Sequence, residues 1–210
     1  MKDPMSLTPE LESRIQGIVD SGTAVLFMKG SPAAPQCGFS AQVVQVLNRL
    51  LPAYETFDVL SDGEVREGVK EFSDWPTIPQ LYIGGEFMGG CDIVKEMYDN
   101  GELHDALGME RAELSADQVE ITISAEAEQI LRNAQQQQGA GLHFGIDAKF
   151  QPFLGFGPAA GTELRVPVGG LFFLLDRDSA GRAQGASITV VDTEHGQRLD
   201  VDIPAVRAGG

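Results

Sequence analysis

Residues 75–79, which read Trp-Pro-Thr-Ile-Pro, constrain the backbone more than any other part of this chain. Two prolines at this spacing exclude a helix, because each lacks a backbone N–H donor and clashes with a preceding helical turn. The runs Gln80 to Ile83 and Glu86 to Met88 follow, separated by Gly84-Gly85. Two glycines between short runs of this kind are typical of a tight turn that joins antiparallel strands. The segment therefore predicts a loop followed by a β-hairpin.

Helix and strand patterns alternate before and after this hairpin. Thr8-Pro9-Glu10 is typical of a helix start and Gly22 of a helix end, and the wholly apolar run Ala24 to Met28 is typical of a strand buried on both faces. The other expected elements are a loop at 30–36, a helix at 40–51, a strand at 54–59, a helix at 62–72 and a helix at 92–100. This order predicts an α/β unit with a small mixed sheet.

The pattern changes after residue 118. Val119 to Ile123 predicts a strand, and Ser124 and Gly139 are typical of the two ends of a helix whose last turn is four solvated glutamines. Further strands are expected at 142–146, 163–168, 171–175, 187–191 and 197–203. This half is predicted to be a mostly-β α+β domain with one helix. The predicted boundaries are a domain at 1–108, a linker at 109–118, a domain at 119–206 and a tail at 207–210.

Composition and charge exclude several classes of protein. Apolar residues make up 42% of the 210 residues and charged residues 22%, as in ordinary globular proteins. The 31 acids and 15 bases give a net charge of −16, which repels phosphate backbones and anionic lipid, so we expect neither nucleic acid nor a membrane as a partner. No apolar run approaches the roughly 20 residues that cross a bilayer, and the N-terminus lacks the order of an export signal. We therefore expect a cytoplasmic protein.

Only two cysteines occur, which is too few for a disulfide scaffold and directs attention to thiol chemistry. Cys37 lies where the predicted loop enters a helix, and the free amides of a helix N-terminus favour a thiolate. Lys29 adds a positive charge, and Gly38 leaves the backbone open to approach. We expect an acidic, exposed thiol rather than the buried, inert cysteine that is common in proteins. Ser40 cannot attack a mixed disulfide as a second cysteine would, so two-cysteine turnover at this motif is excluded.

Four separate motifs occur in one order along the predicted elements. They are Lys29, Cys37-Gly38-Phe39-Ser40, Trp75-Pro76-Thr77-Ile78-Pro79-Gln80 and Gly89-Gly90-Cys91-Asp92. In this combination, about the first 105 residues resemble a CGFS-type monothiol glutaredoxin. The resemblance implies a thioredoxin-like fold, a cis peptide bond between Ile78 and Pro79, and glutathione as the ligand.

The resemblance also implies which residues hold glutathione. The backbone of Ile78 would pair with the bound peptide, and the helix start at Cys91-Asp92 would receive one carboxylate. Arg66 and Lys70 share a helix face, and without the resemblance the better interpretation is a solvated face among neighbouring glutamates. Trp75 is interpreted as a packing residue. The expected glutathione residues are Lys29, Phe39, Arg66, Lys70, Thr77, Ile78, Pro79, Cys91 and Asp92.

Cys37 is also the candidate metal ligand. Iron-sulfur clusters are usually held by four thiolates, and each chain provides one suitable thiolate. With one glutathione thiolate per chain, two chains complete the set for a [2Fe-2S] cluster, which predicts a cluster-bridged homodimer. The resemblance implies the same arrangement and a role in storing, delivering or sensing clusters. The partners it implies are BolA-type proteins and apo iron-sulfur proteins.

Two other functions stay open at this point. Cys37 could accept glutathione from a mixed disulfide, with a second glutathione resolving it, which would make the protein a glutathione-dependent thiol-disulfide oxidoreductase of weak activity. Alternatively, the protein is a non-catalytic interaction module. Cys91 could be a resolving or redox-regulatory thiol, but by the resemblance it is assigned a contact role beside glutathione and no catalytic role.

The second domain is similar to the A-type, HesB-like iron-sulfur carriers over about 85 residues, from ITISAEAEQIL to SITVVDTEHGQRLDVDIP. That family binds metal through three cysteines, and this half contains none. His143 and His195 are too few for a closed metal site, and we expect them to be exposed or locally hydrogen-bonded. The sequence therefore predicts a degenerate relative that keeps the fold without the metal and serves as a docking or dimerisation surface.

Overall fold

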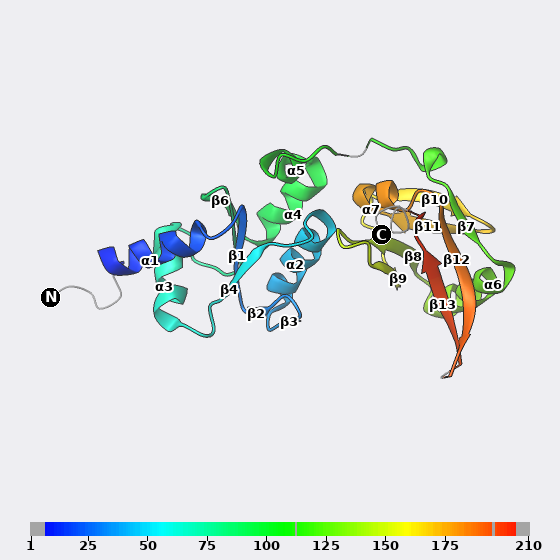
Figure 1. Cartoon of the computed structure of the whole chain (residues 1–210), viewed down its shortest axis with the longest axis horizontal. Coiled ribbons are helices and arrows are strands. Elements are labelled where there is room, and N and C mark those ends of the chain that lie inside the picture. Colours follow the sequence, from blue (N-terminus) through cyan, green and yellow to red (C-terminus); the bar gives the residue numbers. More distant parts are fainter. Residues whose placement is uncertain (1–6, 112, 195, 205–210) are drawn as a thin grey trace. The chain divides into compact units, whose positions relative to one another are not determined.

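The computed structural model describes residues 7–111, 113–194 and 196–204, and the chain divides into two units, Met1–Glu110 and Arg111–Gly210 (Figure 1). The predicted tail at 207–210 and His195 lie outside the described residues. In the described part of the chain, no helix is both long enough and apolar enough to span a bilayer.

A mixed four-stranded sheet forms the centre of the first unit. Its strands are β1 (Ala24–Met28), β4 (Glu55–Asp58), β5 (Gln80–Ile83) and β6 (Glu86–Gly89), in the order β4-β1-β5-β6. β1 runs parallel to β4 and antiparallel to β5, and β5 and β6 form the predicted hairpin. Gly84 and Gly85 in its turn have positive φ angles of 58° and 86°, which glycine adopts without strain.

Helices cover both faces of this sheet. α1 and α3 pack on one face, against Val25 and Phe27, and α2, α4 and α5 pack on the other, against Leu26 and Met28. Burial on both faces explains why β1 is apolar throughout, and the predicted α/β unit with a small mixed sheet is confirmed. The sequence does not predict α5, because five residues are too few to show helical periodicity. The helices are α1 (Pro9–Val19), α2 (Gly38–Leu50), α3 (Gly63–Phe72), α4 (Cys91–Asn100) and α5 (Glu102–Ala106).

The segment between β1 and α2 differs from the plain loop that the sequence predicts. It forms a small antiparallel ribbon of β2 (Gly30–Ser31) and β3 (Ala34–Pro35). Gly30 has a φ of +82°, and a Cβ at this position would lie 2.5 Å from the Ala34 carbonyl oxygen, so the ribbon requires glycine. Two-residue strands leave no alternating pattern in a sequence. The ribbon leads the chain from β1 to Cys37.

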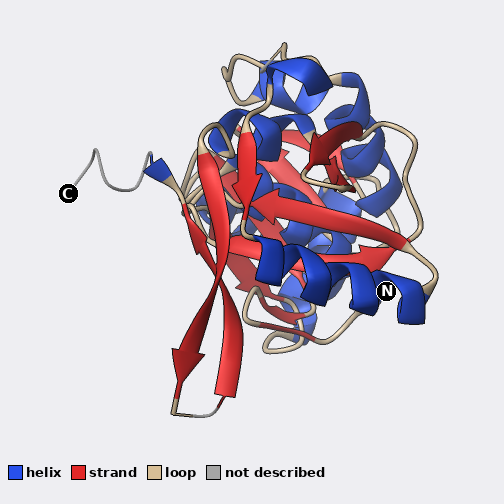
Figure 2. Cartoon of the chain, turned by 90° about the vertical axis from the view of Figure 1, so that its right-hand side faces the viewer, coloured by secondary structure: helices blue, strands red, loops and turns tan. Residues whose placement is uncertain are grey.

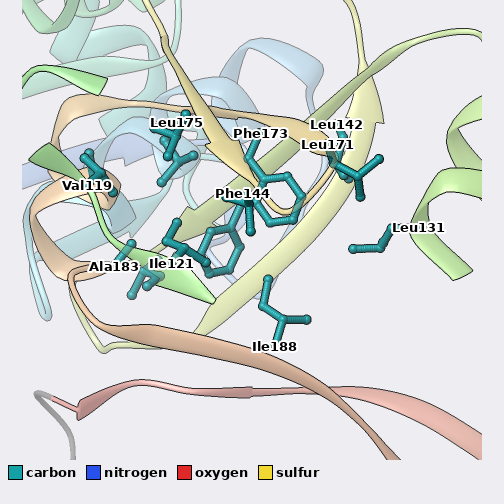
Figure 3. Packing of buried hydrophobic residues seen from close by; sticks show 14 of the residues in the cluster. Val119, Ile121, Leu131, Leu142, Phe144, Leu171, Phe173, Leu175, Ala183 and Ile188 are labelled. Atoms are coloured by element: carbon teal, nitrogen blue, oxygen red, sulfur yellow. The ribbon is translucent and has the colours of Figure 1, made fainter. Parts of the chain in front are cut away.

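Two sheets share one core in the second unit. The four-stranded sheet has the order β10-β11-β8-β9, and the three-stranded sheet has the order β13-β12-β7. Side chains from both sheets and from α6 meet around Phe144 and Phe173 (Figure 3). The expected mostly-β body is therefore confirmed. The elements are η1 (Ala116–Gln118, a 3-10 helix), β7 (Ile121–Ile123), α6 (Ala125–Gln138), β8 (Gly141–Ile146), β9 (Pro152–Gly157), β10 (Leu164–Val168), β11 (Leu171–Leu175), α7 (Arg177–Arg182), β12 (Ala186–Thr193) and β13 (Gly196–Asp202).

Two elements of this unit, β9 and α7, were not predicted from the sequence. The unit therefore has one more α-helix and one more strand than the sequence analysis expects. β9 pairs antiparallel with β8 although its sequence, PFLGFG, begins with proline and contains two glycines, which are depleted in strands. α7 has six residues, and its N-cap Asp176 accepts a hydrogen bond from the Ser179 N–H. Leu114 and Ala116, in the expected linker, pack against the core of the second unit. Long-range packing, which local patterns do not report, accounts for these differences.

β12 and β13 form a long hairpin. Their pairing extends from Ser187 and Asp202 to Thr193 and Gly196, whereas β7 pairs only with residues 186–188 of β12. The end of the hairpin therefore projects from the rest of this unit as a two-stranded ribbon (Figure 2).

Candidate functional site

Cys37 lies at the boundary between the β2-β3 ribbon and α2. It is the N-cap residue of the helix, with an extended backbone (φ −154°, ψ 134°), and its side chain is partly exposed. Gly38 and Phe39 are exposed, whereas Ser40 is completely buried. The Ser40 hydroxyl accepts a hydrogen bond of 3.2 Å from the Lys29 backbone N–H. Ser40 therefore ties the start of α2 to the end of β1 and fixes the position of Cys37.

The surroundings of Cys37 lower the pKa of its thiol. The backbone N–H of Ser40 is the largest cause, and the N–H of Phe39 and the positive charge of Lys29 act in the same direction. Partial burial opposes them by disfavouring the thiolate, but the net shift of the pKa is downward. The two groups that the sequence predicts, the helix N-terminus and Lys29, therefore both lower the pKa of Cys37, and the helix amides lower it more than Lys29 does.

We expect Cys37 to react with iodoacetamide at a lower pH than an ordinary cysteine. Because its pKa is lowered, the thiolate forms, and the alkylation rate rises, at a pH below the usual cysteine range. Cys91 shifts in the opposite direction, since burial raises the pKa of its thiol. Mass spectrometry of alkylation against pH should give two separate midpoints with that of Cys37 lower, and coincident midpoints would contradict this assignment.

A buried glutamine holds the loop at 75–79. The Ile78-Pro79 peptide bond is cis, as the resemblance implies. Gln80 is completely buried, and its Nε2 donates to the carbonyl oxygens of Trp75 at 3.0 Å and of Thr77 at 3.2 Å. Its Oε1 accepts from the Tyr82 hydroxyl at 3.1 Å. These three hydrogen bonds fix the backbone that lies beside Cys37.

A cavity of about 660 Å³ opens next to Cys37. Its volume falls within the ~300–1,000 Å³ typical of small-molecule sites. The end of β1, the starts of α2 and α4, the helix α3 and the 75–79 loop all contribute to its wall. The residues that the sequence predicts for the site all line it: Lys29, Cys37, Phe39, Arg66, Lys70, Thr77, Ile78, Pro79, Cys91 and Asp92.

Three cations, Lys29, Arg66 and Lys70, line this cavity. Lys70 Nζ lies 2.8 Å from a carboxylate oxygen of Glu67, and this contact lowers the pKa of the Glu67 carboxyl. Arg66 Nε lies 3.6 Å from Glu67 and is buried without a hydrogen-bond partner among the described residues. The ion pair with Glu67 agrees with the solvated-face interpretation for Lys70, whereas Arg66 lines the cavity with a buried Nε that makes no hydrogen bond among the described residues.

The N-terminus of α4 also opens onto the cavity. Gly90 is its N-cap and provides no capping side chain, Asp92 is exposed, and Cys91 is buried. The Cys91 thiol donates to Gln42 Oε1 at 3.5 Å. Burial, together with the charge of Asp92, raises the pKa of Cys91. A thiol held in this neutral form agrees with the predicted contact role and is a poor nucleophile.

Four further residues line the cavity and were not assigned to the site from the sequence: Trp75, Pro76, Gly90 and Ile93. Trp75 packs against Phe87, with ring centroids 5.8 Å apart, as the packing interpretation expects. Its indole N–H is nevertheless buried with no hydrogen-bond partner in the described structure. A Cβ on Gly90 would lie 3.0 Å from this nitrogen, so glycine leaves it room. The sequence signal for Trp75 is its position in the same proline-rich loop as Thr77.

Cys37 is not part of a group of metal-binding side chains within the described residues. In residues 7–111, 113–194 and 196–204, no group of three or more His, Cys, Asp or Glu side chains is arranged to hold a metal ion.

His143 in the second unit is hydrogen-bonded locally, as the sequence predicts, since its ring lies 3.3 Å from the Gly157 carbonyl oxygen and 2.9 Å from the Glu163 carboxylate.

Comparison with known proteins gives consistent results for about half of the chain. The profile of the Glutaredoxin family matches residues 24–88, within the first unit. An uncharacterized monothiol glutaredoxin of Synechocystis sp. is 54% identical over 101 residues, which cover 48% of this chain and 94% of that protein. A chloroplastic monothiol glutaredoxin of Oryza sativa subsp. japonica is 52% identical over 109 residues, which cover 52% of this chain and 64% of that protein. The solution structure of reduced apo GrxS14 from poplar is 50% identical, covers 50% of this chain and 95% of its own, and has a TM-score of 0.45.

Proposed function

The chain belongs to the monothiol glutaredoxins, and from this premise we propose that it binds a [2Fe-2S] cluster as a glutathione-dependent homodimer. One observation carries the proposal: each chain presents a single acidified cysteine, Cys37, beside a cavity with cations and free N–H donors. Since such clusters take four thiolates, two chains and two glutathione molecules complete the set. The bound cluster would supply iron and sulfide for delivery to other proteins or for sensing.

Glutathione is the proposed tripeptide because the groups of the cavity match its chemistry. Its two carboxylates require cations or N–H donors, and Lys29, Arg66 and the N-terminus of α4 supply both kinds of group. Arg66 and Trp75 also line the cavity, and their buried Nε and Nε1 atoms make no hydrogen bond in the described part of the chain. The backbone of Ile78 in the fixed loop suits strand-like pairing with a bound peptide.

A second function, deglutathionylation, is favoured by the lowered pKa and partial exposure of Cys37. The Cys37 thiolate would attack the glutathione sulfur of a mixed disulfide, and the other protein would leave as a thiolate. A second glutathione thiolate would then attack the Cys37-bound glutathione, which releases oxidised glutathione and restores the Cys37 thiolate. The Ser40 side chain hydrogen-bonds to Cys37 and helps to lower the pKa of its thiol, but a hydroxyl cannot form a disulfide, so this route is monothiol. A pure interaction module, the third alternative, would need neither reaction.

For the second unit we propose the role of a docking or dimerisation surface. It has no cysteine, and its similarity to HesB-like carriers rests on sequence patterns alone. BolA-type proteins and apo iron-sulfur proteins are the proposed partners of the whole chain. A cysteine-free unit of this kind would orient partners without contributing a thiolate ligand to the cluster.

Anaerobic reconstitution tests the cluster proposal. The purified full chain is incubated with ferrous iron and sulfide, with and without glutathione, and followed by visible absorption and by sedimentation. We expect a brown dimer only with glutathione, since Cys37 is the one cysteine of each chain with a lowered pKa and a dimer therefore supplies two of the four thiolates. A colourless chain that rapidly turns over glutathionylated peptides would favour the oxidoreductase instead. Equal colour and dimerisation without glutathione would contradict the proposed ligand set.

A further inference from the structure

A second cavity, of about 460 Å³, lies wholly within the second unit. α6, β8, β10, β11 and the segment between β9 and β10 contribute to its wall. Leu142, Leu171 and Leu174 form apolar parts of it, and Arg132 and Arg165 are its only charged residues in the described structure. Arg132 forms an ion pair with Glu128, which does not line the cavity, whereas Arg165 has no acidic partner among the described residues, so the cavity keeps a positive charge in a chain with 31 acids and 15 bases. The cavity therefore combines an apolar wall with positive charge.

The Arg165 guanidinium is restrained by stacking on an aromatic ring rather than by an ion pair with a carboxylate. It pairs with Leu174 across the β10-β11 ladder, and its guanidinium carbon lies 4.0 Å from the centroid of the Phe172 ring. Within the described ranges, no hydrogen bond or ion pair engages this guanidinium. Stacking on an aromatic face restrains the group while leaving its N–H donors in the plane free for a ligand.

Arg132 is restrained in a different way. Its Nη2 donates to a Glu128 carboxylate oxygen and, at 3.3 Å, to the carbonyl oxygen of Gly170. Glu128 is in turn bound by the Gly170 N–H, and Arg132 and this N–H together lower the pKa of the Glu128 carboxyl. A Cβ on Gly170 would overlap Arg132 Nη2, so the glycine allows this close approach. These restraints engage Nη2 of Arg132, and its other two nitrogen atoms make no hydrogen bond within the described residues.

We propose that this cavity binds a small molecule that carries an anionic oxygen group, either a carboxylate or a phosphate, on a compact apolar body. Two guanidinium groups restrained before binding lose little conformational freedom when they engage such an anion, and their forked donors match its oxygen atoms. The leucine wall accommodates the apolar part. This site is separate from the Cys37 cavity and does not depend on the function proposed for that cavity.

Titration of the full chain with benzoate, phenyl phosphate and benzyl alcohol, at constant ionic strength, tests the site. NMR of a chain labelled with ¹⁵N in arginine reports on the side-chain N–H groups. We expect one or both anions to shift the Arg165 and Arg132 signals with saturation, and the neutral alcohol to leave them unchanged. Benzoate binding alone identifies a carboxylate ligand, and phenyl phosphate binding alone identifies a phosphate ligand. Equal shifts with benzyl alcohol, or no saturable shift with either anion, would overturn the proposal.

Variants separate this site from a general effect of charge. Arg165→Leu should weaken binding of the anion by about tenfold or more, because charge-assisted hydrogen bonds are lost. Arg198→Leu is the matched control, since Arg198 is an exposed arginine on β13 that pairs with Asp200 outside the cavity. The Arg198→Leu chain should bind the anion with the same affinity as the unmodified chain. Equal weakening in both variants would overturn the proposal, and Arg165→Gln provides the same comparison if the leucine variant does not fold.

Discussion

The Cys37→Ser chain is expected to emerge from anaerobic reconstitution colourless and monomeric, even with glutathione present. A serine hydroxyl keeps the size of the side chain but does not ionise at neutral pH, so the helix amides and Lys29 no longer act on a thiolate. Two of the four proposed sulfur ligands are lost from a dimer at once. Iron and sulfide analysis, the visible spectrum and sedimentation should all return to the background of protein without cluster.

Cys91→Ser is the matched control for this result. Cys91 is buried, its thiol donates to Gln42, and its raised pKa disfavours the thiolate. Serine keeps the size of this side chain and the backbone N–H groups of the α4 N-terminus through which glutathione is proposed to bind, so the variant should keep most of the colour and the dimer. If the cluster survived the loss of Cys37 but not the loss of Cys91, our assignment of Cys37 as the metal ligand would be wrong.

Phe144→Ala is expected to destabilise the second unit by about 3–5 kcal/mol, the range for removal of a large side chain from a packed core. Phe144 is 1% exposed, and its ring meets that of Phe173 edge to face, with centroids 5.9 Å apart and an angle of 64° (Figure 3). The described residues that form this cluster all belong to the second unit. Denaturant-dependent hydrogen exchange should show earlier opening of β8 and β11, while the amides of β1 keep their protection.

Phe153→Ala tests whether burial causes this effect. Phe153 lies on β9, in the same sheet, but is 45% exposed. Its replacement should cost less than about 1 kcal/mol, as surface substitutions usually do. Equal losses from both phenylalanines, or a loss of protection in β1 with Phe144→Ala, would contradict the assignment of a separate core to the second unit.

Local patterns predicted the elements that depend on neighbouring residues. Thr8 with Pro9, and Ser124 with Gly139, mark helix ends because capping is an interaction within a few residues. The Gly84-Gly85 turn follows from the φ angles that only glycine adopts readily. β9 lacks such a signal, since its proline and glycines oppose a strand and only the pairing with β8 stabilises it.

The same distinction applies to the Cys37 site. The motifs named its residues, but the role of Gln80 depends on hydrogen bonds to Trp75 and Thr77 in the folded loop. The unpartnered indole N–H of Trp75 is likewise visible only after its ring has packed against Phe87. A sequence reports which donors exist, and the fold decides which of them stay free for a ligand.

By itself, the sequence determined that Cys37 lies at a helix start and that Ser40, three residues later, cannot resolve a disulfide, because both properties belong to residues close together in the chain. The tertiary structure alone decided that α3, the 75–79 loop and α4 meet around that sulfur, and that Arg132 and Arg165 meet at a second cavity. The physical reason is that the packing of apolar faces brings together side chains that are far apart in the sequence. A local sequence pattern shows which face of an element is apolar, but it does not show which other element packs against that face.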